Sequence, residues 1–394
     1  MQQKRILLVN DYKTCGGAEK VFLDTAELLQ NSFNIKCFFG SEFYKAPGNI
    51  LQFIHSREFF LKFKNGLLTF KPDLVHLHNY YHFLSPSILR AILWFKRHVN
   101  KELKVLMTAH DFHLACPNSG YSHYNWPNNQ LVRVEKRLDY FGLFFKKWDQ
   151  RGISFSLLKQ LQWLFNYKFL RLGDVIGKII APSAFLGSIL QEYTGKDVVV
   201  VRNPIKDCQA KGVASLLPQK HLAKKKNLVF AGRLSSEKGL VQFLRDFQAL
   251  FKHEDIFMDI IGEGAEEQTL RFLIKGLGLE NKVFLLGKMS HAGVLEKLVA
   301  SNAIVLPSIW YENAPLSLVE GALNYCKILT NSFGGMGEIA EICGNFKFLD
   351  KVSIREIEDF ILDKNFHVNA DIAKIFSEDR YVESLTSVYN SLWL

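Results

Sequence analysis

The sequence predicts an α/β protein with two doubly wound halves, each a parallel sheet covered by helices on both faces. Three observations support this prediction. Short apolar runs alternate with segments of helical periodicity along nearly the whole chain, and a polar, lysine-rich stretch at 211–227 interrupts the alternation before it starts again. The last segment, 377–394, has the pattern of an amphipathic helix. Continuous apolar runs between helices are typical of parallel strands, because such strands are buried on both faces.

The first half begins with a strand, a glycine turn and a helix. The apolar run 4–10 leads into the loop at 11–17, and apolar residues recur at helical spacing over 18–29. Another helix is expected at 184–193, before the lysine-rich stretch at 211–227. Further strands are expected at 35–40, 72–79, 104–111, 177–183 and 197–204.

The second half repeats the alternation of strand and helix. Ser235 or Ser236 is expected to cap a helix over 234–251, and Ser290 a helix over 290–302. Other helices are expected at 265–278, after Pro315, and at 334–343. The strands are expected at 227–233, 257–264, 281–288, 303–308 and 327–333.

This pattern divides the chain into three parts. Residues 1–204 are expected to form an N-terminal Rossmann-like domain, and residues 205–376 a C-terminal one. The helix 377–394 is expected to pack back on the N-terminal domain. Ligands of such sheets bind outside the carboxyl ends of the strands, so loops of two facing halves would share one cleft.

The composition favours a cytosolic protein with an anionic partner. The chain has 394 residues, 48% of them apolar, and a net charge of +10, which suits nucleic acid, a membrane face or phosphorylated small molecules. No stretch reaches the roughly 18 apolar residues of a membrane span, and the N-terminal run is too short for a signal peptide. The six cysteines are scattered without a CxxC pair, so reduced thiols are expected rather than a disulfide framework or a metal site; they are Cys15, Cys37, Cys116, Cys208, Cys326 and Cys343.

Two carboxylates bracket the stretch WYENAPLSLVEG at 310–321. Glu312 lies just before a helix that Pro315 is expected to open, and Glu320 lies one to two turns inside it. A helix N-terminus offers free N–H groups and a positive dipole end, which suit a phosphate. The two carboxylates would then bind hydroxyl groups on either side of a diphosphate.

Cations and glycines follow other strands. Arg233 and Lys238 would hold a diphosphate leaving group, although alone they would be interpreted as a solvated surface pair. Gly16 and Gly17 allow close backbone approach to phosphate or form an ordinary tight turn. The turn Gly262–Glu263–Gly264 either approaches a nucleotide or serves only as a turn.

Histidines gather after two strands of the first half. His110 is interpreted either as a site residue or as a structural hydrogen-bonding group. A metal site at His76, His78 and His82 is disfavoured, because neither a cysteine nor a carboxylate lies between them in sequence. No serine or cysteine nucleophile arrangement is recognisable.

The segment 113–172 is a long insertion rich in aromatic residues. Over 133–178 the sequence has ten Lys or Arg residues against four acidic ones. Basic residues mixed with large apolar ones suit an anionic membrane face. The alternative is a helical subdomain with its aromatic rings in a core.

Together these motifs resemble a retaining glycosyltransferase of the GT-B fold, family 4 (glycosyl transferases group 1). The resemblance covers nearly the whole chain. Its most specific features are the Arg233–Lys238 pair and the Glu312–x7–Glu320 spacing. The other matching motifs are GGAEKV, TAHDFHLACP, APSAF, VRNP, FAGRLSSEKGL, IIGEG, LLGKMSHAGV and GGMGEI.

The resemblance implies that residues 1–204 bind the acceptor and residues 205–376 the nucleotide sugar, and it implies roles for the residues above. Glu312 would contact hydroxyls of the donor sugar, Glu320 the nucleotide ribose, and His110 the transferred sugar. The diphosphate would contact Arg233, Lys238 and the backbone N–H groups in the segment Ala314 to Leu316. Gly16 and Gly17 would lie at its border. Gly262 and Glu263 would also line the donor site. In the family's usual mechanism the acceptor attacks from the face that the diphosphate leaves, and neither a metal nor another cofactor is needed.

Two departures from the family pattern are visible. Many relatives have Phe-Gly after the first glutamate, where this sequence has Asn313-Ala314, which leaves the identity of the sugar open. The stretch after Cys116 has no further cysteine before Cys208, so a stapled loop is not expected there.

The sequence therefore predicts a metal-independent, retaining hexosyltransferase that takes its sugar from a UDP or GDP donor. The expected acceptor is a lipid-linked oligosaccharide or a precursor of lipopolysaccharide, capsule or O-antigen at the cytosolic membrane face. Alternatives are a soluble transferase resembling sucrose or trehalose synthases, or a non-catalytic nucleotide-sugar-binding protein. Nucleic-acid binding is not expected, and a dehydrogenase is disfavoured because GxGxxG is missing.

Overall fold

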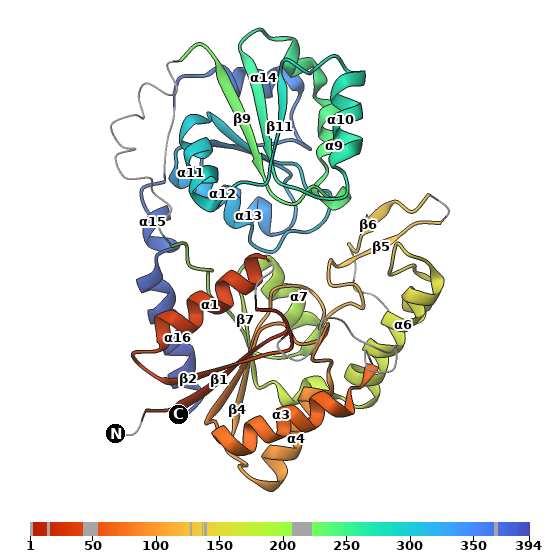
Figure 1. Ribbon diagram of the computed structural model, residues 1–394, viewed down its shortest axis with the longest axis vertical. Helices are drawn as coiled ribbons and strands as arrows, with labels where there is room; N and C mark the ends of the chain where they lie inside the picture. The colour runs from red at the N-terminus through yellow and green to blue at the C-terminus, as the bar shows by residue number, and fades with distance from the viewer. Residues whose placement is uncertain are drawn as a thin grey trace. The chain divides into compact units, whose positions relative to one another are not determined.

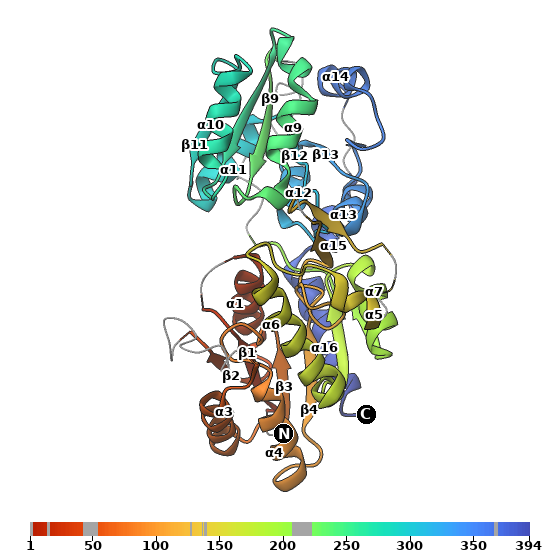
Figure 2. The ribbon, with the colours of Figure 1, turned by 90° about the vertical axis from the view of Figure 1, so that its right-hand side faces the viewer.

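The chain folds into two compact units of the same general architecture. The computed structural model describes residues 3–13, 16–41, 54–126, 128–135, 137, 140–206, 223–365 and 369–394. Unit 1 comprises residues 1–204 and 378–394, and unit 2 comprises residues 205–377. Most of the lysine-rich break at 211–227 lies outside the described residues. Figure 1 and Figure 2 show each sheet lying between layers of helices.

Unit 1 is built around a six-stranded parallel sheet in the order β2-β1-β3-β4-β7-β8. Its strands are β1 (Arg5–Asn10), β2 (Asn34–Phe39), β3 (Leu74–Leu77), β4 (Lys104–Thr108), β7 (Lys178–Ala181) and β8 (Val198–Val200). Its main helices are α1 (Gly17–Leu29), α3 (Arg57–Phe70), α4 (Ser87–His98), α7 (Ala184–Thr194) and α16 (Glu378–Ser391). The strand order reverses direction between β1 and β3, as in flavodoxin-like sheets.

Unit 2 has the strand order β11-β10-β9-β12-β13-β14, again all parallel. Its strands are β9 (Lys226–Ala231), β10 (Ile256–Ile261), β11 (Val283–Gly287), β12 (Ala303–Leu306), β13 (Lys327–Thr330) and β14 (Phe346–Phe348). Numbered within the unit, this is the order 3-2-1-4-5-6 of a Rossmann sheet, and its direction reverses between β9 and β12.

Helices cover both faces of the unit 2 sheet. The α-helices are α9 (Leu240–Asp246), α10 (Glu267–Gly276), α11 (His291–Ala300), α12 (Leu316–Leu323), α13 (Gly334–Cys343), α14 (Ile354–Leu362) and α15 (Ile372–Ile375). Short 3-10 turns, η4 (Ser236–Lys238) and η5 (Gln248–Lys252), precede and follow α9. The predicted fold class, two Rossmann-like units, is thus confirmed; the cleft between them stays a prediction.

One predicted helix start in unit 2 is wrong. Neither Ser235 nor Ser236 caps α9, and the hydroxyl of Ser235 instead donates to Glu237 Oε1 at 2.7 Å. Gly239, with a φ of +71°, closes the η4 turn and directs the chain into α9. The helix predicted over 234–251 is therefore three short pieces. Ser290 does cap α11, by accepting from the Gly293 N–H at 3.2 Å.

The C-terminal helix α16 packs on unit 1, beside α1 (Figure 1). Its buried face carries Tyr381, Leu385, Val388 and Tyr389, which join the core of β1 and β3. The hydroxyl of Tyr381 shares a 2.6 Å hydrogen bond with Thr25 of α1. The chain thus returns to the first unit after completing the second.

The aromatic insertion folds as helices and a small hairpin, and its side chains divide between core and surface. It contains β5 (Ser122–Tyr124), β6 (Leu131–Arg133), α5 (Tyr140–Phe145), α6 (Ile153–Trp163), the π-helical turn η1 (Leu164–Phe169) and the 3-10 turn η2 (Leu172–Val175). Trp148 and Trp163 are fully buried. An apolar stripe, by contrast, is exposed at four-residue intervals: Ile153, Leu157, Leu161, Phe165 and Phe169.

Candidate active site

The predicted site residues of unit 2 gather where the sheet order reverses. Arg233 and Lys238 lie in the loop after β9, while the segment from Glu312 to Leu316 follows β12, the neighbouring strand. Gly262 and Glu263 follow β10 on the other side of β9. The carboxyl ends of strands at such a reversal form the usual ligand crevice of an open α/β sheet. Gly16, Gly17 and His110 belong to unit 1.

Lys238 and Glu312 form the centre of this region. Lys238 Nζ lies 2.7 Å from Glu312 Oε1, and the two side chains are only 16% and 12% exposed. The same Oε1 accepts from the Ser308 hydroxyl at 2.6 Å and from the Trp310 indole N–H at 2.8 Å. Three donors thus converge on one carboxylate oxygen and fix the orientation of the group.

The environment of Glu312 keeps its carboxyl group ionised. Burial by itself would raise its pKa, but the charge of Lys238 and the hydrogen bonds from Lys238, Ser308 and Trp310 lower it below the usual value of 4.5. At neutral pH the site therefore holds a fixed carboxylate beside a fixed ammonium group. Such a pair can accept from a ligand hydroxyl and attract a ligand phosphate without further rearrangement.

The start of α12 lies beside this pair. Helix α12 begins at Leu316, one position later than predicted, and Pro315 precedes it in an extended conformation. The φ of proline suits both conformations, and its ψ of 105° places it outside the helix. The N–H of Gly335, from α13, donates to the Glu312 carbonyl at 2.7 Å. Asn313 and Ala314, which connect Glu312 to Pro315 and α12, are half-buried.

Arg233 and Lys238 have different carboxylate partners, although the sequence suggested that they act together. Arg233 pairs with Glu237 at 2.9 Å and is 65% exposed, whereas Lys238 is largely buried against Glu312. Arg233 is therefore the more mobile cation, held only by a surface ion pair of small energy. A bound diphosphate could recruit it at little cost.

Glu320 projects from the second turn of α12 and has a partner that sequence reasoning missed. Its Oε1 lies 3.0 Å from Nε2 of His291, the first residue of α11. The sequence shows a histidine directly after the Ser290 cap, but it does not predict a contact between residues that are 29 positions apart. Ser308 and Trp310 were missed in the same way, although Trp310 lies in the same motif as Glu312.

The turn after β10 is held by close backbone packing. Gly262 has a φ of +144°, and a Cβ there would lie 1.8 Å from the Gly232 carbonyl oxygen, so only glycine fits. Glu263 forms an exposed ion pair with Lys288 at 2.9 Å. The turn is thus required by the fold, and contact with a donor stays a prediction for both residues.

In unit 1, His110 lies two residues after the end of β4 and contacts the buried His78, which directly follows β3, the neighbouring strand. Its Nε2 lies 2.9 Å from Nδ1 of His78, whose pKa burial lowers well below 6.5. Burial likewise lowers the pKa of His110 to about 4, so its ring is neutral at pH 7. His76 bonds Tyr389 of α16 and Thr108 of β4, both at 2.7 Å. These contacts hold the strand ends in place.

The glycines of unit 1 lie at the start of α1. Gly17 is its first residue, and both Gly16 and Gly17 are exposed. The Gly16 carbonyl accepts from the Lys20 N–H at 3.2 Å, as in the first turn of a helix. This helix start follows β1, next to the sheet reversal of unit 1, which is compatible with the predicted phosphate border.

The described residues were expected to hold neither a metal nor a membrane-spanning helix. Among those residues, no group of three or more His, Cys, Asp or Glu side chains has the arrangement of a metal site. The helices there include none with the length and hydropathy needed to cross a bilayer. The four described cysteines, Cys37, Cys116, Cys326 and Cys343, are thiols; Cys15 and Cys208 lie outside the described residues.

Comparison with known proteins agrees with this architecture. The sequence profile of glycosyl transferases group 1 matches residues 216–356, which include most of unit 2. An uncharacterised 42.6 kDa protein in the cps region of Klebsiella pneumoniae is 26% identical over 83% of this chain and 74% of its own length.

Solved structures show the same fold over the whole chain. Sucrose-phosphate synthase from Thermosynechococcus elongatus superposes with a TM-score of 0.68 at 13% identity, covering 99% of both chains. Anabaena HepE in complex with UDP-glucose superposes with a TM-score of 0.62 at 15% identity, covering 98% of this chain and 99% of its own. Unit 2 thus matches the glycosyl transferases group 1, and the whole chain has the GT-B fold of the solved structures.

Proposed function

We propose that this glycosyltransferase moves a hexose-type sugar, with retention, from a UDP or GDP donor to a lipid-linked glycan precursor. The acceptor would be an oligosaccharide, lipopolysaccharide, capsule or O-antigen precursor at the cytosolic face of the membrane. The observation that carries the donor part is the largely buried Lys238–Glu312 pair beside the N-terminus of α12.

The pair divides the work of holding a nucleotide sugar. Lys238, joined by Arg233 on binding, would neutralise the diphosphate as negative charge grows on the leaving group. Glu312 would accept from sugar hydroxyls, and Glu320 from the ribose. With two cations on the leaving group, neither a metal nor another cofactor is needed for charge stabilisation. Asn313, Ala314, Pro315 and Leu316 would line the diphosphate, with Gly262 and Glu263 nearby.

Retention by attack from the face that the diphosphate leaves needs no protein carboxylate as nucleophile, unlike retention by double displacement. Three donors already hold Glu312 Oε1 as an acceptor, an arrangement that suits positioning better than nucleophilic attack. The incoming hydroxyl would attack from the face that the diphosphate leaves, and a diphosphate oxygen would take its proton. His110, neutral at pH 7, would hydrogen-bond the transferred sugar.

The apolar stripe supports the membrane part of the proposal. Its five side chains are between 39% and 78% exposed, and Phe144 and Phe145 of the preceding helix are 57% and 70% exposed. Large apolar side chains exposed together along one helix suit a membrane surface, and nearby cations such as Lys168 and Arg171 suit anionic headgroups. The name of the Klebsiella relative, which places it in a cps region, points in the same direction.

Two variants test the donor site. Lys238→Ala should lower turnover strongly, because it removes charge stabilisation from the leaving group, whereas Glu320→Gln should mainly raise the KM for the nucleotide sugar. Arg271→Ala, which removes an exposed ion pair with Glu267, is the matched control in unit 2. Full activity in both site variants would overturn the assignment.

The acceptor is tested with the same enzyme and two substrate classes. Transfer to a lipid-linked glycan but not to free sucrose-type acceptors is expected. Transfer to free sugars alone would favour the soluble transferase alternative, and nucleotide-sugar binding without transfer to either would favour the non-catalytic one.

A further inference from the structure

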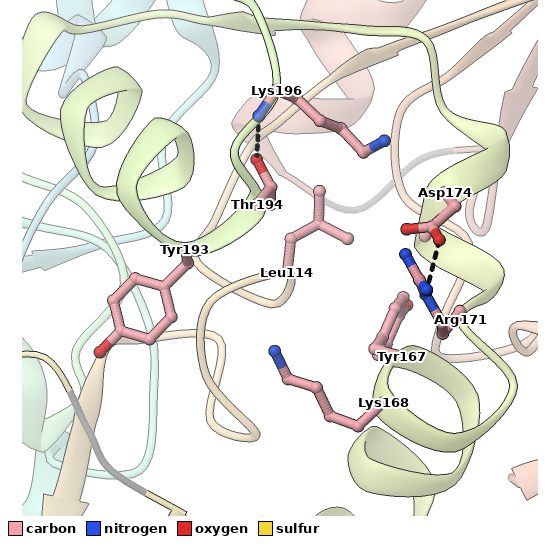
Figure 3. Close-up of a pocket in the computed structure, with 9 residues that line it drawn as sticks. Leu114, Tyr167, Lys168, Arg171, Asp174, Tyr193, Thr194 and Lys196 are labelled. Carbon is pink, nitrogen blue, oxygen red and sulfur yellow. Dashed lines mark hydrogen bonds and ion pairs between the residues drawn. The ribbon is translucent and has the colours of Figure 1, made fainter.

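A basic pocket lies in unit 1 between the π-helical turn η1, the 3-10 turn η2 and the C-terminal end of α7 (Figure 3). Its volume is about 300 Å³, which is enough for a phosphate or diphosphate group with adjoining atoms. Leu114 forms an apolar wall, Tyr167 and Tyr193 lie at its sides, and three cations line it: Lys168, Arg171 and Lys196. None of these residues has a role in the proposed donor site.

The charges in the pocket do not cancel. Asp174 is the carboxylate that lines the space, and it pairs with Nε of Arg171 at 2.8 Å. This ion pair offsets one of the positive charges of the pocket. Lys168 and Lys196 add two further positive charges, so the pocket has an excess of cations over carboxylates.

The two lysines reach the pocket from different elements. Figure 3 shows Lys168 extending from η1 toward Leu114, and Lys196 extending from the segment after α7 toward the side of Asp174. Both lysine side chains are half-buried rather than solvated. Holding several cations around one cavity is unfavourable by mutual repulsion unless an anion binds between them.

The pocket is continuous in sequence with the apolar stripe. Lys168 immediately precedes Phe169, the most exposed member of the stripe at 78%, and Arg171 follows two residues later. A ligand with an apolar chain and a phosphate headgroup matches this combination of surfaces. Three cations on separate elements favour phosphate over a carboxylate, because a phosphate presents more acceptor oxygens.

We propose that this pocket binds the phosphate or diphosphate group of an anionic ligand, with the headgroup of the lipid-linked acceptor as its source. The lipid part rests on the proposed function, whereas the phosphate site does not. The acceptor's sugar end and its phosphate end would then be recognised by different parts of unit 1.

Calorimetric titration of the full chain with inorganic pyrophosphate tests the site itself. The pocket variant Lys168→Gln/Lys196→Gln is compared with Lys71→Gln/Lys101→Gln, two exposed lysines of the same unit that give the same change in net charge. Each lost charge-assisted contact should weaken binding by about tenfold. The donor-site variant Arg233→Gln/Lys238→Gln should keep this binding event, which separates it from pyrophosphate bound in unit 2. Equal affinity in the pocket and control variants would overturn the proposal.

Vesicle binding distinguishes the two sources of phosphate. Phosphatidylcholine vesicles containing farnesyl diphosphate are compared with vesicles given the same charge by phosphatidylglycerol. A preference of the wild-type chain for the diphosphate vesicles, lost in the pocket variant, supports a lipid headgroup. Pyrophosphate binding without that preference supports the phosphate site and overturns its lipid source. If neither anionic vesicle is bound while pyrophosphate still is, the membrane part of the proposed function fails and the phosphate site stands.

Discussion

At the scale of single residues, the site of unit 2 depends on the contact between Lys238 and Glu312. Each side chain is almost out of solvent, so each charge needs the other. The motif predicted a carboxylate before a helix and a lysine after another strand, but their meeting is a contact across 74 residues. Sequence periodicity gives no distance over such a separation, which explains why the direct ion pair was not foreseen.

Lys238→Ala should destabilise unit 2 as well as slow the reaction. Removing one partner leaves Glu312 buried and unpaired, at a cost of about 3 kcal/mol in the free energy of unfolding. Arg271→Ala, from the exposed pair with Glu267, should cost less than about 1 kcal/mol. Urea unfolding checks both values, and equal small losses would contradict the account of the pair.

The pair also predicts a pH dependence with a definite sign. The pKa of Glu312 is lower in the folded chain than the usual 4.5, so its contribution to stability is present above about pH 4.5 and is lost as the pH falls through the folded pKa. In Glu312→Gln this acid-side loss should be missing. Urea unfolding of both proteins between pH 3 and pH 6 measures it; parallel curves would contradict it.

Asp11 should behave in the opposite way. It follows β1, is fully buried, and accepts the N–H groups of His82, Phe83 and Leu84 at 2.8 to 3.0 Å. Burial nevertheless raises its pKa from 3.8 to about 6, against the lowering effect of those bonds. Its ionisation therefore opposes folding: stability is highest below about pH 3.8 and falls by about 3 kcal/mol as the pH rises through 6.

Asp11→Asn removes this titration and tests the sign. The stability of the wild-type chain relative to the variant should decline between about pH 4 and pH 6 and then level off. Asp73→Asn, at another carboxylate of unit 1 that accepts a backbone N–H, is the matched substitution. A relative stability that rises over this range would show that the backbone hydrogen bonds outweigh burial.

At the scale of elements, the apolar stripe on α6 and η1 offers a test with a closely matched control. Phe169→Ser should weaken binding to anionic vesicles, because it removes the most exposed anchor of the stripe. Phe272 of α10 is 77% exposed, against 78% for Phe169, and lies in unit 2. Phe272→Ser should therefore leave flotation unchanged. Equal effects of the two substitutions, or no flotation of the wild-type chain at low salt, would contradict a membrane role for the stripe.

The helix α16 should be an integral part of unit 1. Tyr389 is buried, and its hydroxyl bonds His76 at 2.7 Å. Tyr389→Phe keeps the ring and removes one buried hydrogen bond, which should cost about 1–2 kcal/mol in the free energy of unfolding. Tyr389→Ala should cost about 3–5 kcal/mol because it also opens a cavity. Near-neutral effects of both would show that the helix does not stabilise the unit.

The elements also show what the sequence can and cannot predict. The expected strands of both sheets are present, most of them shorter than predicted, because buried parallel strands are continuous apolar runs that stand out in the sequence. The hairpin β5–β6 and the edge strand β14 were not predicted, since each strand has three residues and is only partly buried. The helix expected over 234–251 is broken at Gly239, where a positive φ follows from tertiary contacts.

At the scale of the whole molecule, the two units have related but different strand orders. Unit 2 has the Rossmann order, and its loops at the reversal carry Lys238 and Glu312. Unit 1 has a flavodoxin-like order, and its loops carry Gly16, Gly17 and His110. The alternation of apolar runs and helices predicted the repeat, and the two units divide between Pro204 and Ile205, before the lysine-rich break. The apolar stripe and the basic pocket depend on how the insertion folds, which its composition alone did not determine.

The most direct test of the central claim is a thermal-shift panel of UDP, GDP, CMP, ADP and NAD in the presence of a metal chelator. A ligand that binds only the folded state raises the melting temperature. The account predicts a clear shift with UDP or GDP that is reduced in Lys238→Ala and in Glu320→Gln, and none with NAD. The account would be contradicted by melting temperatures that no nucleoside diphosphate changes. It would also be contradicted by a shift with UDP or GDP that is seen without the chelator and lost in its presence.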